Sequence, residues 1–519
     1  MGRQSTSKPT GHRSRPNRSL PAVVLVVSAC LATFASPTAA VSGRPAPPRH
    51  VEVRSVSQTS IGLSWMPSPN PGPVIRYRIY VNAALRASVR TTSYRVGGLR
   101  CGTSYVVAVD AYDADRGSSI RWARRLNTQR CADDRARPRP PEAAKCSKTI
   151  GAETGLAPAI VSARAGSVVC LRSGTYSGFT LSNVSKASDV TLQPAPGATV
   201  TFNSSVALHH DTHIRVSGLG GTMSIAGINV DDAGGCEYHV TVDHVVFTAP
   251  GQTSSGCTNS DVLFDHDSWD NLGTGSSEGR FTIYGSHSSA GPVGITVSNS
   301  HFGGEGPGGT CSDGVEVLGA YGVQIGPGNE FTGIYQNGCT NGAHADPIGY
   351  SEAPHLLVIG NYFHDNGDGS GGMLGDTNET DFGVVGGSVI TQNVFVCSGY
   401  PYSILGYGAK GFTITHNTFA GGGLVRFEEE DRSKPSGNLV RDNVFAPGGG
   451  ISLSAASAGY GTNDHNLNAG QPGTADIRGT PVFVGGKKPT SYAGFVLAAG
   501  SPGKEAASHG GDMGISGDG

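Results

Sequence analysis

From Val240 onward the chain repeats one pattern, in which a short run of alternating apolar and polar residues ends on an aromatic side chain. Such alternation is typical of β-strands that bury one face. Successive aromatic residues are separated by 22, 33, 29, 32, 32, 24 and 26 positions. They are Phe247, Trp269, Phe302, Phe331, Phe363, Phe395, Phe419 and Phe445. This period, with two or three short strands in each repeat, predicts a parallel β-helix, whose coils must stack because no single coil can bury its apolar face alone.

An asparagine stands two residues before the aromatic residue in five successive repeats. The five are Asn329, Asn361, Asn393, Asn417 and Asn443. Side chains that recur at one bend of a solenoid can hydrogen-bond along the stack and satisfy the amides of the turn. We therefore predict a structural asparagine ladder at this bend.

Residues 46–131 have a different pattern, with short alternating strands at the spacing of a β-sandwich. Trp65 lies in the second strand, and Leu99 begins a Leu-x-x-Gly-Thr-x-Tyr run that ends at Tyr105. The segment resembles a fibronectin type III domain, and the resemblance implies a spacer or a weak polymer-binding unit. We expect Cys101 and Cys131 to pair, and residues 132–145, which are charged and proline-rich, to form a linker.

Residues 1–40 read as a secretory signal peptide, with a basic head, an apolar core over 20–35 and small residues before a cleavage site after Ala40. The run from Val27 to Cys30 also resembles a bacterial lipobox, which would leave Cys30 as a lipid-anchored N-terminus. The apolar core is short for a membrane span, and we expect no transmembrane segment elsewhere. The sequence thus predicts a secreted protein, which we expect to be a monomer.

Composition narrows the class further. The chain has 38 basic and 40 acidic residues, so it is not a polybasic protein that binds nucleic acid. Its 78 glycines and many Val, Ile and Phe triplets indicate an all-β chain rich in turns. Ten cysteines in an exported chain indicate disulfides. From proximity in the sequence we expect three in the solenoid and leave Cys397 unpaired: Cys146–Cys170, Cys236–Cys257 and Cys311–Cys339.

Residues 146–519 resemble the right-handed parallel β-helix proteins of the pectin-lyase-like superfamily. Besides the repeats, the opening over 157–176 resembles the first cap and coil of these proteins, and residues 480–502 resemble their final segment. The resemblance implies the fold but not the reaction, because the superfamily contains lyases, hydrolases, esterases and non-catalytic adhesins.

The candidate site lies in two tandem copies of one unit over residues 311–363. Each copy opens with an aspartate before a short strand, Asp313 in the first and Asp346 in the second. Stacking would place the two carboxylates one strand spacing apart, roughly 4.8 Å. The four repeat intervals around this stretch, from Trp269 to Phe395, are also the longest. Their additional residues should leave the coils as loops that form the wall of a cleft.

Charge in this region favours hydrolysis over elimination. No lysine or arginine occurs between Arg280 and Lys410, whereas the same interval holds eleven acidic residues. Elimination from a uronate needs the substrate carboxylate neutralised, so a lyase would need bound Ca²⁺ here, with His344, Lys410 or Arg426 as the base. Hydrolysis of a more neutral glycan needs only paired carboxylates, one protonated and one ionised, and no cofactor.

Ser312 to Glu316 resembles the Asn-Thr-Asp-Gly strand of polygalacturonase-type hydrolases, but the other motifs of those enzymes have no counterparts in this stretch. Our candidate catalytic residues are Asp313, Glu316, His344 and Asp346. The competing interpretation is that both aspartates only cap turn amides. Glu316 should face outward, because Val315 and Val317 take the inward positions.

Two further groups of candidates flank these residues. A Gly- and Asn-rich segment could chelate Ca²⁺ through the oxygens of Asp365, Asp368, Asp376 and Asp381. A substrate could contact Tyr400, Tyr402, Tyr407, Arg426 and Glu428, although the tyrosines could equally be packed cover and the last two a surface ion pair. The sequence thus predicts a carbohydrate-active protein that cleaves a polysaccharide, with a non-catalytic glycan-binding surface protein as the alternative.

Overall fold

The computed structural model describes most of the chain after residue 44. The described residues are 45–56, 60–69, 76–81, 84–97, 99, 104–113, 117–119, 121–127, 143–231, 238–255, 260–270, 272, 279–285, 293–304, 311–336, 339, 344–367, 372–376, 386–397, 402–429, 434–453, 460–468, 470, 473–508 and 510–516. The predicted signal peptide, Cys30, Cys101, Cys131, Cys236, Cys257 and most of the predicted linker lie outside these ranges, so those predictions stay as they are. Within the ranges, no helix is long and apolar enough to cross a membrane.

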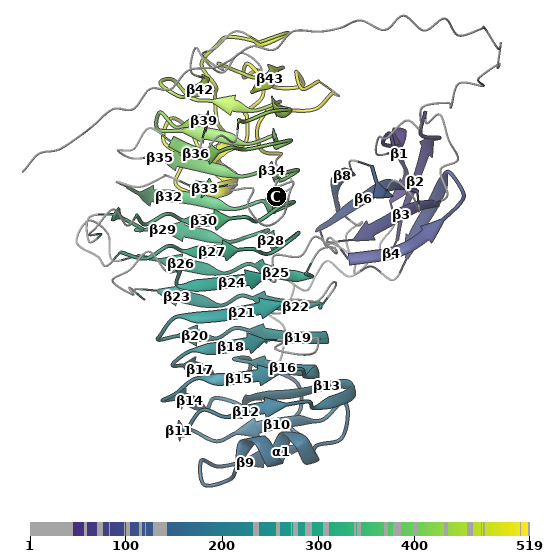
Figure 1. The fold of residues 1–519 in the computed structure, drawn as a ribbon. Coiled ribbons are helices and arrows are strands. Elements are labelled where there is room, and N and C mark those ends of the chain that lie inside the picture. Colours follow the sequence, from purple (N-terminus) through teal and green to yellow (C-terminus); the bar gives the residue numbers. More distant parts are fainter. Residues whose placement is uncertain are drawn as a thin grey trace, which may run out of the picture. The chain divides into compact units, whose positions relative to one another are not determined.

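The N-terminal part is an antiparallel β-sandwich (Figure 1). One sheet has the order β1-β2-β5, and the other has the order β4-β3-β6-β7 with β8 also on β6. Trp65 is buried between the sheets and packs edge-on against Tyr77, with ring centroids 5.4 Å apart. The strands are β1 Arg49–Val56, β2 Ser60–Met66, β3 Arg76–Val81, β4 Ala84–Val89, β5 Ser93–Gly97, β6 Ser104–Asp113, β7 Gly117–Ser118 and β8 Trp122–Asn127.

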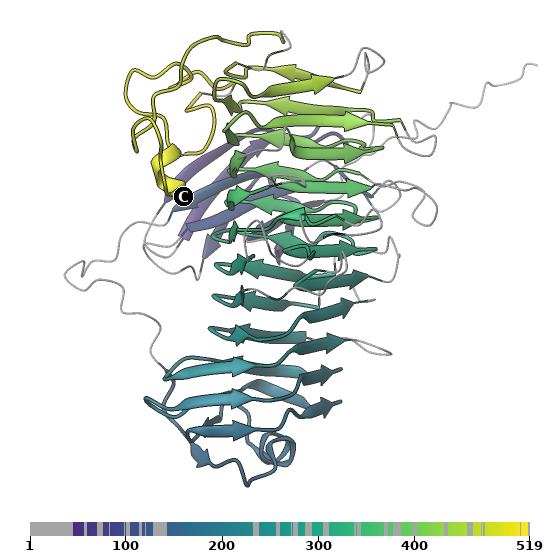
Figure 2. The ribbon, with the colours of Figure 1, turned by 90° about the vertical axis from the view of Figure 1, so that its left-hand side faces the viewer.

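The rest of the chain is a parallel β-helix of three sheets, as predicted (Figures 1 and 2). From β10 onward, each strand pairs in parallel with the strand three places later in the sequence, and β9 pairs with β10. The first, which we call the β9–β43 sheet, contains β9 Lys148–Ile150, β10 Val168–Leu171, β13 Ser185–Pro194, β16 Thr212–Ser217, β19 Tyr238–Asp243, β22 Val262–Asp265, β25 Ile295–Ser298, β28 Gln324–Ile325, β31 Leu357–Ile359, β34 Val389–Thr391, β37 Thr413–Thr415, β40 Asn438–Arg441 and β43 Gly461–Asp464.

The β11–β41 sheet contains β11 Gly174–Tyr176, β14 Thr199–Phe202, β17 Thr222–Ile225, β20 Val246–Phe247, β23 Ser268–Asp270, β26 His301–Gly303, β29 Glu330–Thr332, β32 Tyr362–Asn366, β35 Val394–Cys397, β38 Thr418–Ala420 and β41 Val444–Phe445. The β12–β42 sheet contains β12 Thr180–Ser182, β15 Val206–His209, β18 Ile228–Asp231, β21 Gly251–Ser255, β24 Phe281–Gly285, β27 Val315–Leu318, β30 Ile348–Ser351, β33 Met373–Asp376, β36 Tyr402–Tyr407, β39 Leu424–Glu428 and β42 Gly450–Leu453.

The first coil of the β-helix is closed by α1 (Leu156–Ser162), which buries Leu156, Ala159 and Ile160. This helix gives the exposed end of the apolar core a cover, as the sequence predicted. The Cys146–Cys170 disulfide, also predicted, ties the segment before β9 to β10.

The recurring aromatic residues form one stack inside the β-helix. From Phe247 to Phe445 their ring centroids follow one another at 4.6–5.1 Å, and the ring planes differ by 12° or less. The stack follows from the parallel register, because each aromatic residue pairs with the equivalent residue of the next coil. Coil length therefore varies outside the strands without disturbing the core.

The predicted asparagine ladder is present at the bend between the β9–β43 and β11–β41 sheets. Asn361 is typical, because its Nδ2 donates to Asn393 Oδ1 at 2.9 Å and to the Ile325 carbonyl at 3.0 Å. Its backbone N–H donates to the same Asn393 Oδ1 at 2.9 Å. The ladder runs one rung further than the sequence pattern showed, to Asn466.

Asp267 occupies the equivalent position, two residues before Trp269. Its carboxylate has the oxygen Oδ2 where the asparagines of the ladder have the donor Nδ2. Its Oδ1 accepts the Val245 N–H at 2.9 Å, whereas Oδ2 is buried and has no hydrogen-bond partner among the described residues. Burial raises the pKa of this carboxyl well above its ordinary value. The folded protein thus holds the proton of Asp267 more tightly than the unfolded chain does. The stability of the folded protein therefore falls as the pH rises from the pKa that Asp267 has in the unfolded chain through the pKa that it has in the folded protein.

We therefore expect Asp267→Asn to raise the free energy of unfolding at neutral pH by about 1–3 kcal/mol, because the new Nδ2 can donate as its neighbours do. Urea denaturation of both proteins at acidic and neutral pH measures the effect. The gain should shrink at acidic pH, where Asp267 is protonated, and an equal gain at both pH values would contradict the explanation.

The C-terminal segment folds back along the β-helix, which the sequence did not reveal (Figure 2). Residues from Phe483 to Ile515, which include the 3-10 helix η3 (Tyr492–Phe495), pack against outward-facing residues of the β11–β41 sheet such as Val394 and Val444. The Tyr492 hydroxyl donates to the Gln392 carbonyl at 2.5 Å. This cover explains why the outer face of the last coils is apolar.

Candidate functional site

The parallel register brings the two predicted aspartates to the same place on adjacent coils. Val315 pairs with Ile348 and Glu316 with Gly349 along β27 and β30. Asp313 and Asp346 stand two residues before these strands, and the Gly314 N–H donates to the Asp346 carbonyl at 2.9 Å. The sequence therefore predicted this juxtaposition correctly.

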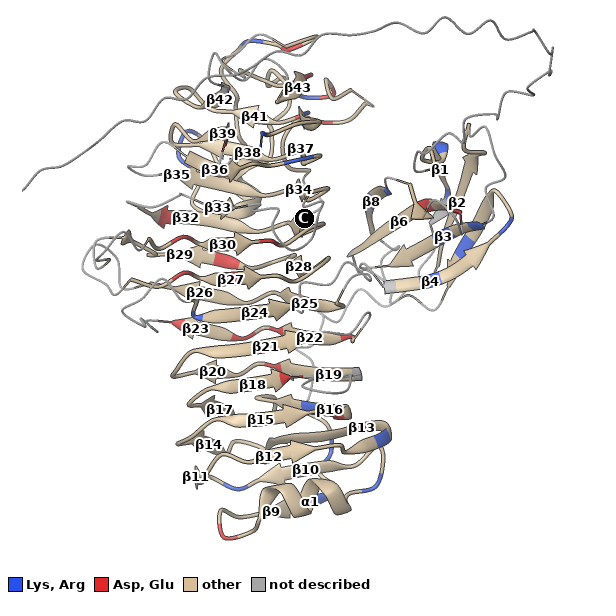
Figure 3. Ribbon diagram, in the orientation of Figure 1, with Lys and Arg blue, Asp and Glu red and all other residues tan. Residues whose placement is uncertain are grey.

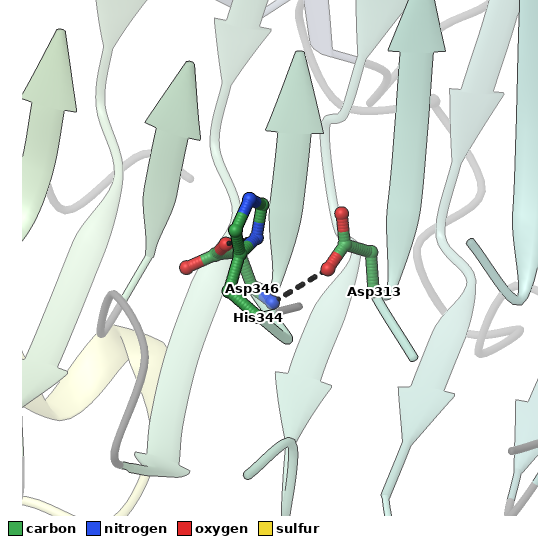
Figure 4. Close-up of side chains that lie close together, drawn as sticks. All are labelled: Asp313, His344 and Asp346. Carbon is green, nitrogen blue, oxygen red and sulfur yellow. Dashed lines mark hydrogen bonds and ion pairs between the residues drawn. The ribbon is translucent and has the colours of Figure 1, made fainter. Parts of the chain in front are cut away.

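Both aspartates are buried, with 1% of Asp313 and none of Asp346 exposed to solvent. Asp313 Oδ1 accepts the backbone N–H of Asp346 at 2.7 Å (Figure 4). Asp313 does cap a turn amide, as the competing interpretation held. That role uses only one of its two carboxylate oxygens.

His344 completes the cluster from the start of the same turn. Its Nδ1 lies 2.6 Å from Asp346 Oδ2, and 40% of its side chain is exposed (Figure 4). One ligand atom from each of Asp313, His344 and Asp346 lies within 4.8 Å of the others. The three side chains thus form a compact group in which His344 is the member that solvent reaches.

The surroundings of the cluster raise the pKa of both Asp313 and His344. Burial first, and the charge of Asp346 second, raise the pKa of the Asp313 carboxyl well above its ordinary value. The hydrogen bond with Asp346 raises the pKa of His344, against the opposing effect of burial. Asp313 therefore keeps its proton to a higher pH than an exposed aspartate does, and His344 is a stronger base than a free imidazole.

Glu316 faces outward, as predicted, on the outer surface of the β12–β42 sheet. It is half-buried, and its Oε2 accepts the Gly279 N–H at 3.2 Å and the Thr282 hydroxyl at 3.4 Å. Gly349, its partner on β30, carries no side chain at the equivalent outward position. A Cβ on Gly349 would lie 2.1 Å from Asp313 Oδ2 and 3.9 Å from Glu316 Cγ. Asp313 Oδ2 thus occupies the place that a side chain at position 349 would take, beside Glu316.

We expect Gly349→Ala to lower the rate of any reaction that uses Asp313 by about 10²-fold, because the new methyl group must displace the reacting oxygen. Enzyme kinetics and thermal melting of the variant measure this. Gly155→Ala is the matched control, since its Cβ would meet nothing nearer than 3.5 Å. Full activity of Gly349→Ala would show that Asp313 Oδ2 does not react.

The segments that carry the cluster are tied together by the predicted Cys311–Cys339 disulfide. Cys311 lies two residues before Asp313, and Cys339 five residues before His344. The bridge therefore fixes the two turns from which all three side chains project. The side chain of Cys397 lies outside the described part, so its predicted free thiol stays a prediction.

Four of the five predicted substrate-binding residues lie on the same sheet as β27 and β30. Arg426 of β39 forms an ion pair with Glu428 and a hydrogen bond with the Tyr402 hydroxyl, and its guanidinium stands 4.9 Å from the centre of the Tyr402 ring. Tyr407 pairs in register with Glu428. Tyr402 and Tyr407 of β36 lie two strands from β30, and Arg426 and Glu428 of β39 lie three strands from it, which places the group about 10–14 Å from Asp346 along the sheet. Tyr400 lies outside the described residues.

The predicted calcium ligands are not seen together. Asp365 belongs to β32 of the β11–β41 sheet, where its carboxylate lies 2.7 Å from His364 Nδ1. Asp376 ends β33 of the β12–β42 sheet, and only its backbone is described. Asp368 and Asp381 are among the residues that the structure does not describe. A calcium site in this segment therefore stays a prediction, and the tightest group of possible ligand types in the described part is Asp313, His344 and Asp346.

Sequence reasoning overlooked Arg280 as a part of this site. In the sequence, Arg280 marked only the start of the stretch that contains no lysine or arginine. The charged residues that Figure 3 colours in that stretch are therefore all Asp or Glu. In the structure Arg280 is 2% exposed, and its Nη1 donates to the carbonyls of Ser312 and Asp313 at 2.6 and 3.1 Å. The signal that could have identified it is its place immediately before β24, one coil ahead of Asp313.

Comparison with known proteins identifies the first domain. Residues 46–127 match the family model of the fibronectin type III domain, which confirms the predicted sandwich. The chain is 42% identical over 59 residues to chitinase D of Niallia circulans and 37% identical over 70 residues to chitinase Chi52 of Paenibacillus xylanexedens. These matches cover 11% and 14% of this chain, and the chain spans only 11% and 13% of those relatives.

Two solved structures align with most of the chain. A PL6 family alginate lyase mutant aligns over 72% of this chain and 59% of its own, with 13% identity and a TM-score of 0.39. Pectate lyase Pel9A aligns over 71% of this chain and 96% of its own, with 16% identity and a TM-score of 0.37. The fold described above follows from the strand pairing of this chain, and the reaction is argued from the residues of the site.

Proposed function

We propose that the protein is a carbohydrate-active enzyme that hydrolyses glycosidic bonds of a polysaccharide at the Asp313, His344 and Asp346 cluster. The observation that carries the proposal is one buried carboxyl with a raised pKa beside a His–Asp pair in which the histidine is 40% exposed and the aspartate is buried. Hydrolysis of a glycosidic bond needs an acid for the leaving oxygen and a base for the attacking water.

We assign these two tasks to different members of the cluster. Asp313 is the acid, because burial keeps it protonated and Gly349 leaves room for its Oδ2. As the carbon–oxygen bond breaks, the proton of Asp313 passes to the leaving oxygen. His344, oriented by Asp346, is the base that takes a proton from water as the oxygen of that water bonds to the sugar carbon. The carboxylate of Asp346 raises the pKa of His344, which makes this imidazole a stronger base.

Three further observations support a glycan substrate. The sheet that carries β27 and β30 also carries Tyr402, Arg426 and Glu428. A chain of several sugar rings could reach from these residues to Asp346. The absence of lysine and arginine between Arg280 and Lys410 favours a glycan with few carboxylates. Two curated relatives of the matched segment are called chitinases, and their substrate class is therefore the first to try.

The full chain should be incubated with neutral polysaccharides, including chitin, and with polyuronates, each with Ca²⁺ or with a chelator. We expect new reducing ends in chelator, without the ultraviolet absorbance of unsaturated uronates. Reducing ends together with that absorbance would replace the proposal by a lyase. Binding of a polysaccharide with neither signal would replace it by a non-catalytic glycan-binding protein.

A further inference from the structure

Arg280 is buried next to the backbone of the candidate acid. An arginine that is 2% exposed is unusual, since burying a charged group costs free energy unless hydrogen bonds replace its water. Its guanidinium donates to three backbone carbonyls: Nε donates to Gly303 at 3.1 Å, and Nη1 donates to Ser312 at 2.6 Å and to Asp313 at 3.1 Å.

These carbonyls belong to the two ends of one loop. Gly303 ends β26, and Ser312 and Asp313 lead into β27, so the side chain of Arg280 spans the segment between the two sheets. The backbone N–H of Arg280 donates to the Asp313 carbonyl as well, at 2.8 Å. Asp313 is therefore held by its carbonyl from the preceding coil, while its Oδ1 is held by the following coil through the Asp346 N–H.

We propose that Arg280 is a positioning residue for Asp313. Arg280 fixes the backbone that carries the acid, and it places a permanent positive charge close to that acid. The inference rests on the proposed function for its effect on the reaction, but the contacts themselves do not depend on it. Arginine is suited to this task because its planar guanidinium stays charged and offers several N–H donors in a fixed geometry.

The positive charge has a measurable consequence. It opposes burial and the charge of Asp346, both of which keep Asp313 protonated. Removing the charge should therefore raise the pH at which Asp313 loses its proton. A purely structural arginine would change the melting temperature without moving that pH.

The first test needs no substrate. Thermal stability is measured against pH for the full chain and for Asp313→Asn, and the difference between the two curves reports the titration of Asp313. The same pair is then made with Arg280→Gln. We expect the midpoint of the difference curve to move to higher pH in the Arg280→Gln pair and to stay near its original place in an Arg280→Lys pair. An unchanged midpoint in both would overturn the inference.

The second test uses the polysaccharide that the full chain cleaves. Arg280→Gln should lower kcat by about 10-fold to 100-fold, as expected when a reacting group is misplaced, with a smaller change in KM. Arg215→Gln is the control for the loss of an arginine, because Arg215, whose side chain is 35% exposed, pairs with Asp243 on another sheet. Equal kcat in Arg280→Gln and the unaltered protein would also overturn the inference. A shifted midpoint in a protein that cleaves nothing would uphold the role of Arg280 and reject the proposed function instead.

Discussion

Replacing Asp313 by asparagine should lower the rate of polysaccharide cleavage by about 10²–10⁴-fold, the usual contribution of a general acid. The same change should leave the melting temperature at neutral pH equal or higher. An asparagine Oδ1 can still accept the Asp346 N–H, and the amide removes a buried carboxyl that the fold keeps protonated at a cost in stability. Steady-state kinetics and thermal melting of the two proteins measure both effects.

Asp267→Asn is the matched control for this result, since Asp267 is an equally buried aspartate that also caps a turn. It should change stability and leave the rate of cleavage unaltered. If Asp313→Asn were as active as Asp267→Asn, Asp313 would be a turn cap and nothing more.

Gly375→Ala should destabilise the β-helix by about 1–3 kcal/mol, the usual cost of overpacking a core. A Cβ at Gly375 would lie 2.0 Å from Cζ of Tyr350, whose ring occupies the space above the glycine. Tyr350 belongs to the coil of Asp346 and pairs with Gly375 of the following coil. Urea denaturation of the variant measures the loss.

A shorter side chain at position 350 tests the cause of that loss. Tyr350→Leu should cost less stability when combined with Gly375→Ala than it does alone, because it removes the atoms that the new methyl group meets. Additive costs in the double variant would show that the ring of Tyr350 is not what requires a glycine there.

The fold was predictable because its signal is repeated. One aromatic position and one asparagine position, read over successive coils, define the core stack and the ladder, and parallel pairing then determines the register. The juxtaposition of Asp313 with Asp346 followed from the same repeat. The two described disulfides were predicted as well, since each joins cysteines that are close in the sequence.

The rest depended on contacts that do not repeat. Arg280 reaches the turn of Asp313 through a long side chain, and its role follows from three carbonyls that no residue pattern marks. Gly349 is one of 78 glycines, and only the position of Asp313 Oδ2 distinguishes it. The C-terminal cover occurs once, so periodicity could not reveal which sheet it meets.

The pH dependence of kcat/KM for polysaccharide cleavage tests the central claim most directly. A protonated Asp313 and an unprotonated His344 together require a bell-shaped profile, in which the rate falls as the pH rises through the pKa of Asp313 and falls as the pH drops through that of His344. In His344→Gln the acidic limb should disappear and the alkaline limb should remain. A rate that keeps rising with pH in the unaltered protein would contradict the assignment of Asp313 as the acid.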